Sequence, residues 1–212
     1  MVLPIIAYGD PVLRKVGTEI PPDYPQLKTL IANMYDTMNA AYGVGLAAPQ
    51  VGLSIRLFVV DASPFADDDE LSEEEQTFLK GFKKTFINAK IVEETGDTWN
   101  FNEGCLSIPG VREDVSRHKQ ITIEYFDEDF NKQTLTIGGL AARIIQHEYD
   151  HLDGVLFIDR GDPEFKQATI ENFKRREERR REKAAQKEAQ ARKIAAKIAH
   201  KKQTAQEATS RC

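Results

Sequence analysis

The sequence predicts an α+β fold over residues 1–165, followed by a basic C-terminal helical extension over residues 166–212. Segments of strand character stand before and between helical segments without regular β-α-β alternation, which is typical of α+β proteins. Beyond residue 173, strong helix formers continue without a proline or glycine to interrupt them. With 212 residues, 41% of them hydrophobic, the chain is long enough to bury a core.

The first half of the chain contains one expected helix and two expected strands. Apolar residues recur at helical spacing over residues 25–41 and predict a helix. Short apolar runs over residues 55–60 and 85–92 predict strands. Residues 66–75 are dominated by Asp and Glu, so we expect a surface insertion there with no further role.

The second half is expected to contain a hairpin, a helix and a short strand. Apolar and polar residues alternate over residues 120–126 and 133–137, which predicts a hairpin. Two glycines precede a helical pattern over residues 140–152, and the apolar residues 155–158 predict a last strand. The charged C-terminal helix is expected to begin near Pro163.

Charge is unevenly divided along the chain. The formal net charge of −5 combines 15 basic and 6 acidic residues in 166–212 with 14 basic and 28 acidic residues in 1–165. Such asymmetry is typical of proteins with a nucleic-acid-binding appendage. The chain shows neither the apolar span of a membrane helix nor the pattern of a signal peptide. Its two cysteines make no disulfide framework. We therefore expect a cytoplasmic protein with no membrane partner.

The predicted helix over residues 140–152 contains the sequence HEYDH, an HExxH pattern. Residues four apart lie on one helix face, so His147 and His151 can reach one ion, and Glu148 can take a proton from water on that ion. Both histidines continue an apolar stripe that includes Leu140 and Ile144. Because burying two histidines without a shared partner is costly, the pattern favours a metal site over a chance pair.

The residues alone leave the third metal ligand open, although a catalytic ion usually has three protein ligands. Cys105 is flanked by glycine and proline and is predicted to lie on a turn between elements. A lone cysteine, however, is more often a small buried hydrophobe. Glu164 or Glu171 would complete a protease-type site of two histidines and one glutamate, although a glutamate near a charged tail is usually only solvated.

Three segments together resemble the peptide deformylase family. The family's signature motifs are a GxGLAAxQ loop, an EGCLS turn and an HExDH helix, in that order. Here they are GVGLAAPQ over residues 43–50, EGCLS over 103–107 and HEYDH over 147–151. Three ordered motifs are far more specific than HExxH alone, and the resemblance covers about residues 3–165.

The resemblance implies an α+β fold in which mixed or antiparallel sheets surround a central helix carrying HExDH. It implies a metal-dependent hydrolase that removes the N-terminal formyl group from formylmethionine of nascent polypeptides and releases formate. Cys105 then becomes the third metal ligand beside His147 and His151. Water bound to the metal attacks the formyl carbon, with Glu148 as general base and then acid. The resemblance favours Fe²⁺ as the ion, and the same ligands also suit Zn²⁺ or another divalent ion.

The resemblance also assigns substrate contacts. Gln50 and the backbone N–H of Leu106 would stabilise the oxyanion, and Gly45 would line the substrate cleft. A methionine side chain needs apolar walls. Arg143 stands where an apolar residue is expected, which puts the shape of the pocket in question. The residues expected to form the walls are apolar and close to the motifs: Val44, Phe101, Leu140 and Ile144.

Two other functions compete with this interpretation. A zinc endopeptidase built on HExxH would need no Cys105 and would cut unblocked internal peptide bonds. An RNA-binding or ribosome-binding protein could keep a structural metal site, although such a site has no use for Glu148 beside an open position. The basic extension suits contact with ribosomal RNA, and some deformylases use a C-terminal helix in this way; a solvated tail is the simpler alternative.

Overall fold

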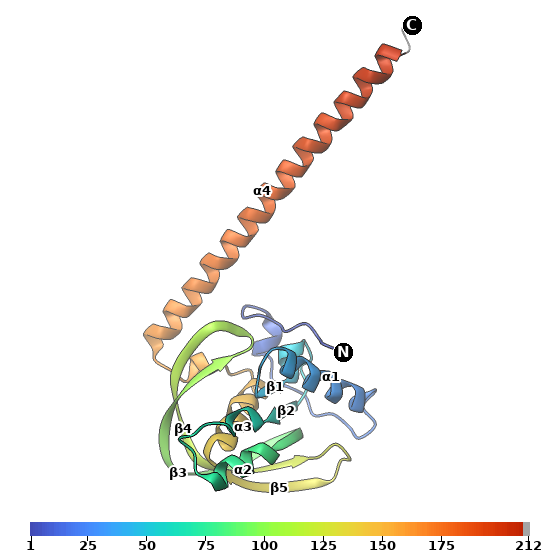
Figure 1. Ribbon diagram of the computed structural model, residues 1–212. Helices are drawn as coiled ribbons and strands as arrows, with labels where there is room; N and C mark the ends of the chain where they lie inside the picture. The colour runs from blue at the N-terminus through green and yellow to red at the C-terminus, as the bar shows by residue number, and fades with distance from the viewer. Residues whose placement is uncertain (210–212) are drawn as a thin grey trace. The chain divides into compact units, whose positions relative to one another are not determined.

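The computed structural model describes the backbone of residues 1–209 and the side chains of residues 1–176 and 178–191. Residues 1–166 form one compact unit, and the chain from Gln167 onward forms a second. The α-helices and strands, in chain order, are α1 Leu27–Ala40, β1 Gly45–Ala47, β2 Leu57–Asp61, α2 Glu73–Gly81, β3 Lys83–Cys105, β4 Ile108–Phe126, β5 Lys132–Gly138, α3 Gly139–Leu152 and α4 Pro163–Thr209 (Figure 1).

The five strands form one antiparallel sheet in the order β1-β2-β3-β4-β5. Its largest part is the hairpin of β3 and β4, which pair over most of their length and close at Cys105 and Ile108. Several register shifts interrupt this pairing, and such shifts let a long hairpin bend. Figure 1 shows the two strands as a curved band beside α3.

Strand alternation divides the core between two helices. Successive side chains on a strand point to opposite faces, so Phe58 and Val60 of β2 join the core cluster that includes Ile145 of α3. Leu57 and Val59 point the other way and join the cluster that includes α1. The helix α3, which carries HEYDH, is thereby packed against the sheet on one side of β2.

Several sequence predictions are confirmed, with small changes of bounds. The expected helices over 25–41 and 140–152 correspond to α1 and α3, and the expected hairpin corresponds to the end of β4 with β5. The short strand expected at 85–92 is only the beginning of the 23-residue β3. Cys105, expected on a turn outside any element, is the last residue of β3 and borders the turn at residues 106–107.

One expectation, the strand after α3, is wrong, and two others are made more specific. The acid-rich segment is not only an insertion, because Glu73–Gly81 form α2; Ser72 and Glu75 cap its first turn with reciprocal hydrogen bonds. No strand follows α3, since Phe157–Asp159 form a 3₁₀ turn in which the Asp159 carboxylate accepts from the Leu156 N–H at 2.8 Å. The sheet is antiparallel throughout. Within the described residues, parallel pairing is limited to an isolated bridge between Thr18 and Ile55, outside the sheet.

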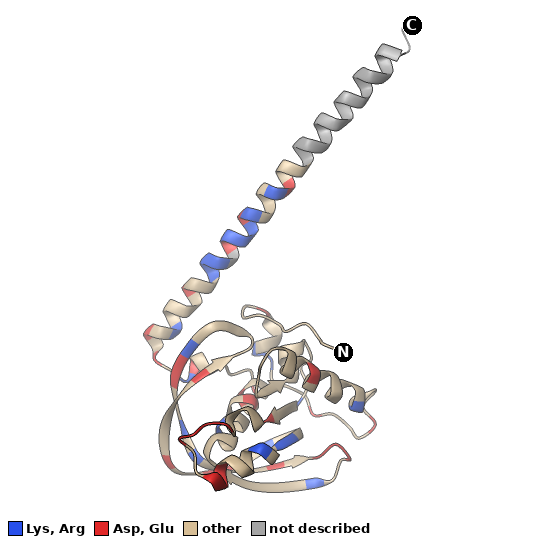
Figure 2. Ribbon diagram, viewed as in Figure 1, with Lys and Arg blue, Asp and Glu red and all other residues tan. Residues whose placement is uncertain are grey.

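The second unit is formed by the helix α4 from Gln167 onward. The helix itself begins four residues earlier, at Pro163, within the first unit. Asp162 caps this start, because its carboxylate accepts from the backbone N–H groups of Glu164 and Phe165. Figure 2 shows Lys and Arg side chains following one another along the helix, as the sequence predicts. Among the helices within the described residues, none is long and apolar enough to cross a membrane.

Candidate metal centre

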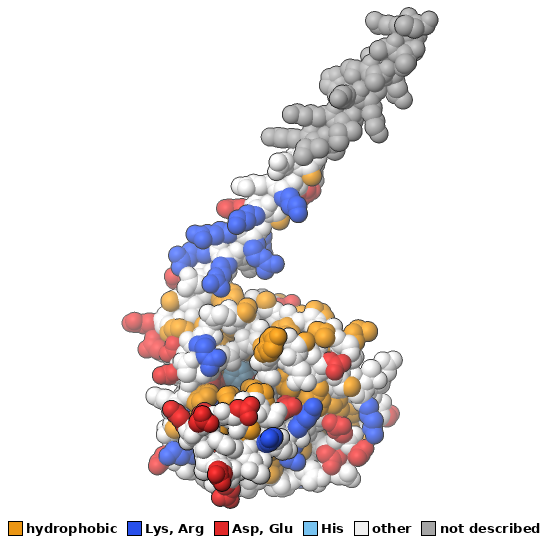
Figure 3. All heavy atoms as spheres, in the orientation of Figure 1, with side chains coloured by type: hydrophobic (Ala, Val, Ile, Leu, Met, Phe, Trp, Pro, Cys, Tyr) orange, Lys and Arg blue, Asp and Glu red, His pale blue; other side chains and the backbone are white. Residues whose placement is uncertain are grey.

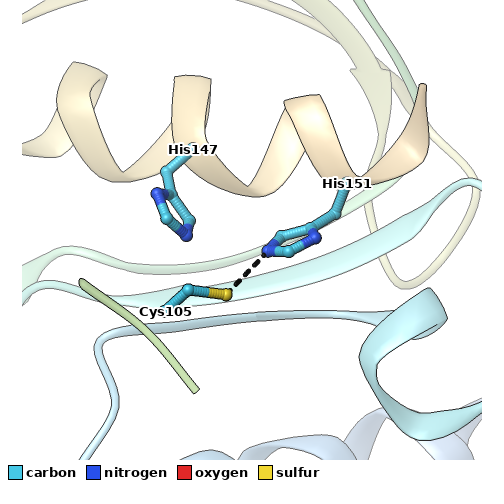
Figure 4. A group of neighbouring side chains, drawn as sticks. All are labelled: Cys105, His147 and His151. Atoms are coloured by element: carbon cyan, nitrogen blue, oxygen red, sulfur yellow. Dashed lines mark hydrogen bonds between the residues drawn. The ribbon is translucent and has the colours of Figure 1, made fainter. Parts of the chain in front are cut away.

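Three side chains from two elements meet beside α3. Cys105 at the end of β3 and His147 and His151 on α3 each offer one ligand atom, and these atoms all lie within 4.8 Å of one another. The sulfur of Cys105 is 3.3 Å from Nε2 of His151 (Figure 4). A thiolate and two imidazoles, gathered this closely, fit three corners of a tetrahedral metal site and leave the fourth corner for another ligand.

A carboxylate behind the site orients His147. Oε2 of Glu103 lies 2.9 Å from Nδ1 of His147, which therefore carries the hydrogen and leaves Nε2 free to bind an ion. Glu103 is buried, with an exposed fraction of 5%. Burial alone would raise the pKa of Glu103, but hydrogen bonds from His147 and Arg117 hold this pKa well below its usual value. The residue is therefore an anion within the fold.

Buried arginines compensate the charge of Glu103. The guanidinium of Arg117 donates to both carboxylate oxygens, at 2.7 and 2.9 Å, and Nη1 of Arg143 donates to one of them at 3.0 Å. Arg117 also bonds to Asp150 at 2.7 Å, and Asp150 in turn accepts from Arg160. A buried charge is tolerable only when paired in this way. The network ties β3, β4 and α3 together behind the metal ligands.

Glu148 is buried directly beside His147, with an exposed fraction of 4%. Burial raises the pKa of Glu148 to about 7, against the opposing effect of His147. Within the described residues, no hydrogen-bond partner is found for its Oε2. The backbone of Gly45 passes so close that a Cβ added there would lie 2.4 Å from Oε1 of Glu148. Glycine at position 45 is thus required by the position of the carboxylate.

The side-chain amide of Gln50 is held in one orientation. Its Oε1 accepts from the backbone N–H of Ala47 at 2.8 Å, so Nε2 is the atom directed at the sulfur of Cys105, at 3.5 Å. Leu106 follows Cys105 immediately in the chain. An amide donor and a backbone N–H are therefore placed next to the three-ligand cluster.

A cavity of about 600 Å³ ends at this cluster. Cys105, His147, Glu148, Gln50 and Leu106 all line it, whereas His151 does not. Figure 3 shows a histidine side chain at the bottom of a hollow whose rim carries both hydrophobic and charged side chains.

Four of the five residues expected to line the substrate cleft do line the cavity, and one does not. Val44, Gly45, Phe101 and Ile144 line the cavity. Leu140 does not; it packs against the hydrophobic core around α3, one turn before Ile144, so its expected place in the wall is corrected.

Several cavity residues were not expected from the sequence. Phe65 packs edge-on against Phe101, with ring centroids 6.3 Å apart, and lines the wall. Arg143, which had put the shape of the pocket in question, lines the cavity as well, but its guanidinium is turned to Glu103 and to the backbone oxygens of Val115 and Trp99. A charged residue at an expected apolar position, Arg143, was the sequence signal for the buried ion-pair network around Glu103. The other partners lie far apart in the chain and gave no pattern.

Comparisons with known proteins identify relatives of the first unit. The profile of the polypeptide deformylase family matches residues 2–167. A peptide deformylase of Flavobacterium johnsoniae is 68% identical over 160 residues, which cover 76% of this chain and 82% of that protein.

Solved structures agree with these sequence matches. The crystal structure of a peptide deformylase from Legionella pneumophila matches with a TM-score of 0.70 and 35% identity, covering 84% of this chain and 99% of the other. A peptide deformylase from Synechococcus elongatus in complex with actinonin matches with a TM-score of 0.69 and 38% identity, covering 80% and 86%.

Proposed function

Because the chain belongs to the polypeptide deformylase family, we propose that it hydrolyses the formyl amide of formylmethionine at the start of nascent polypeptides and releases formate. One observation carries this proposal: a cysteine sulfur and two imidazoles lie within ligand distance of one another, and a buried carboxylate lies beside them at the end of one cavity. Since its substrate is made by ribosomes, we also propose that the enzyme acts in the cytoplasm.

Cys105, His147 and His151 would hold one divalent ion, and we propose Fe²⁺, with Zn²⁺ as a substitute the same ligands accept. When bound, the ion supplies Lewis acidity that lowers the pKa of a coordinated water towards neutrality. The hydrogen bond from His147 Nδ1 to Glu103 keeps the imidazole in the tautomer that ligation needs.

Glu148 is proposed as the general base and then the general acid. Its Oε2 takes a proton as water adds to the formyl carbon and returns it to the amine nitrogen as the C–N bond breaks. The products are formate and a peptide with a free amino group. Gly45 leaves the room that this carboxylate needs beside the cavity.

Gln50 and Leu106 are proposed to stabilise the negative charge that develops on the formyl oxygen. The amide of Gln50 is already oriented by its bond to Ala47, so its N–H groups need no reorganisation during the reaction. Removing one donor of this kind costs about 3 kcal/mol of transition-state stabilisation in comparable enzymes. Methionine would be selected by the apolar wall that contains Val44, Phe101 and Ile144.

The test is formate release from formyl-Met-Ala-Ser by protein loaded anaerobically with Fe²⁺, compared with a Glu148→Ala variant loaded in the same way. We expect release by the parent and a loss of at least about a hundredfold in the variant. Equal rates would remove Glu148 from the mechanism. Cleavage of unblocked peptides at internal bonds, without formate release, would instead support the endopeptidase.

A second part of the proposal concerns α4. Between residues 174 and 187 the helix carries eight Lys and Arg residues, and their described side chains are exposed. We propose that this basic run binds ribosomal RNA phosphates and brings the enzyme to emerging chains. Residues 192–209, which carry further basic residues, lie outside the described side chains.

Co-sedimentation with ribosomes at 50 mM and 200 mM salt tests this contact. The full chain should bind more tightly at low salt, and deletion of residues 174–212 should abolish binding without changing formate release from a free peptide. A variant with Arg179, Arg180 and Arg181 changed to Gln keeps the helix formers and should bind about tenfold or more weakly at low salt. Binding by the deletion variant equal to that of the full chain would contradict the proposal.

A further inference from the structure

An unusual residue ends the helix α1. The backbone N–H of Gly43 donates to the oxygen of Met38 at 2.9 Å, and that of Tyr42 donates to the oxygen of Asn39 at 3.1 Å. These two bonds make a Schellman cap, whose central residue adopts the left-handed conformation and is usually glycine. Here that residue is Tyr42, with a φ of 55°. A bulky residue in this region is strained, so the cap does not explain the tyrosine.

Packing does not explain it either. The exposed fraction of Tyr42 is 97%, the highest among the exposed large hydrophobic residues of the described chain. Within the described part of the structure, the Tyr42 ring has neither a hydrogen bond nor a ring contact. A strained position therefore holds an aromatic side chain that contributes nothing visible to the stability of the fold.

Its place in the molecule points to a ligand contact. Tyr42 lines the mouth of the same cavity that ends at the metal ligands. Its neighbour Gly43 approaches Leu106 so closely that an added Cβ would lie 2.7 Å from Cδ1 of Leu106, which keeps the Tyr42 backbone close to the site. The rest of the exposed mouth includes Pro64, Pro109 and Arg112.

The structure of a formylated peptide indicates which of its residues would lie at this mouth. If the formyl group lies at the buried end by Glu148 and the methionine side chain lies against the apolar wall, the next residues of the peptide must leave towards solvent. We propose that Tyr42 is a specificity-determining residue whose ring packs against the side chain that follows formylmethionine, so that the enzyme prefers an aromatic or large aliphatic residue there. This inference rests on the proposed function and adds a preference at the second position.

The experiment measures kcat and KM of Fe²⁺-loaded parent and Tyr42 variants on formyl-Met-X-Ser peptides with X as Phe, Leu or Gly. Tyr42→Gly should raise KM for the Phe and Leu peptides about fivefold to tenfold, with kcat unchanged, and should leave the Gly peptide within about twofold. Tyr42→Phe should behave like the parent. Val16→Ala is the matched control, since Val16 is 65% exposed and lies outside the cavity lining.

A second measurement separates a ligand contact from a structural role. Glycine relieves the left-handed strain at position 42, so Tyr42→Gly should raise the Tm by about 2–4 °C while it weakens recognition of the Phe peptide. An equal loss on all three peptides, an unchanged KM on all three, or a lower Tm with a lower kcat would overturn the inference. Formate release by the parent on none of the peptides would overturn the proposed function as well, and this outcome is distinct from the others.

Discussion

Glu103 and His147 stand 44 positions apart in the chain, yet Oε2 of the carboxylate and Nδ1 of the imidazole lie 2.9 Å apart. The same carboxylate holds Arg117 and Arg143, so one buried anion serves both a metal ligand and the ion-pair network of the core. The orientation of a metal ligand and the stability of the fold are therefore linked through Glu103.

Replacing Glu103 by Gln should weaken both metal binding and the stability of the fold. The amide removes the negative charge that Arg117 and Arg143 share, so the free energy of unfolding should fall by about 3–5 kcal/mol. The affinity for the divalent ion should fall about 10-fold to 100-fold, measured by competition with a chromogenic chelator at a temperature where the variant is folded. Glu124→Gln is the control, because the Glu124–Lys132 pair is exposed and its loss should cost at most about 1 kcal/mol. An unchanged metal affinity in a folded Glu103→Gln protein would exclude the orienting role.

Gly45→Ala should impair catalysis more than stability. The new methyl group would occupy space now filled by the Glu148 carboxylate and would displace it, and a displacement of about 1 Å can cost about a hundredfold in rate. We expect kcat for formate release to fall by about that factor while circular dichroism stays native. Gly81→Ala is the matched control, since an added Cβ there meets nothing within 4 Å and the residue ends the helix α2. If both variants kept the parental kcat, the close contact would have no catalytic meaning.

Metal binding should stabilise the fold through Cys105. A ligand that binds only the folded state adds about 4 kcal/mol when present at about a thousand times its Kd. Addition of Zn²⁺ or Fe²⁺ to chelator-treated protein should therefore raise the Tm, and Cys105→Ala should remove most of that increase. Cys212→Ala controls for the loss of a thiol and should keep the full increase. A metal-dependent Tm increase of equal size in both variants would remove Cys105 from the ligand set.

Asp159 should make stability depend on pH in the acid range. Burial opposes its ionisation, but hydrogen bonds from Arg14 and Lys166 lower the pKa of Asp159 below its usual value. A lowered pKa means that this carboxylate stabilises the fold above a pH of about 3.9 and loses that contribution as the pH falls further. Asp159→Asn should thus be less stable than the parent by about 0.5–1 kcal/mol at pH 7, and urea unfolding should show the gap closing towards pH 2.

The exposed pair of Lys28 and Asp129 provides the comparison for this prediction. Asp129→Asn should unfold like the parent at every pH, because both side chains are more than 70% exposed. A gap between the Asp159→Asn variant and the parent that stayed constant from pH 7 to pH 2 would show that the carboxyl charge is not the cause.

Local patterns predicted the elements whose signal is contained in a few neighbouring residues. The 3.6-residue period of α1 and α3 and the alternation at the β4–β5 hairpin are such signals, and they are confirmed. The capping sequence at Ser72 and Glu75 is an equally local signal for α2, but the density of acidic residues around it led only to the expectation of a surface insertion. The apolar residues 155–158 predicted a strand, but Phe157–Asp159 form a 3₁₀ turn in which the Asp159 carboxylate accepts a hydrogen bond from the Leu156 N–H.

The family, the place of His147, Glu148 and His151 on one helix, and the basic composition of the extension all follow from the amino-acid sequence, because each depends on contiguous residues or on ordered motifs. Three relationships became known only from the folded chain: Glu103 lies behind His147, Arg143 faces Glu103, and Tyr42 stands at the cavity mouth. These relationships join positions brought together by the sheet and by the packing of α3 against it. A pattern of neighbouring residues cannot indicate which residues far apart in the chain come into contact.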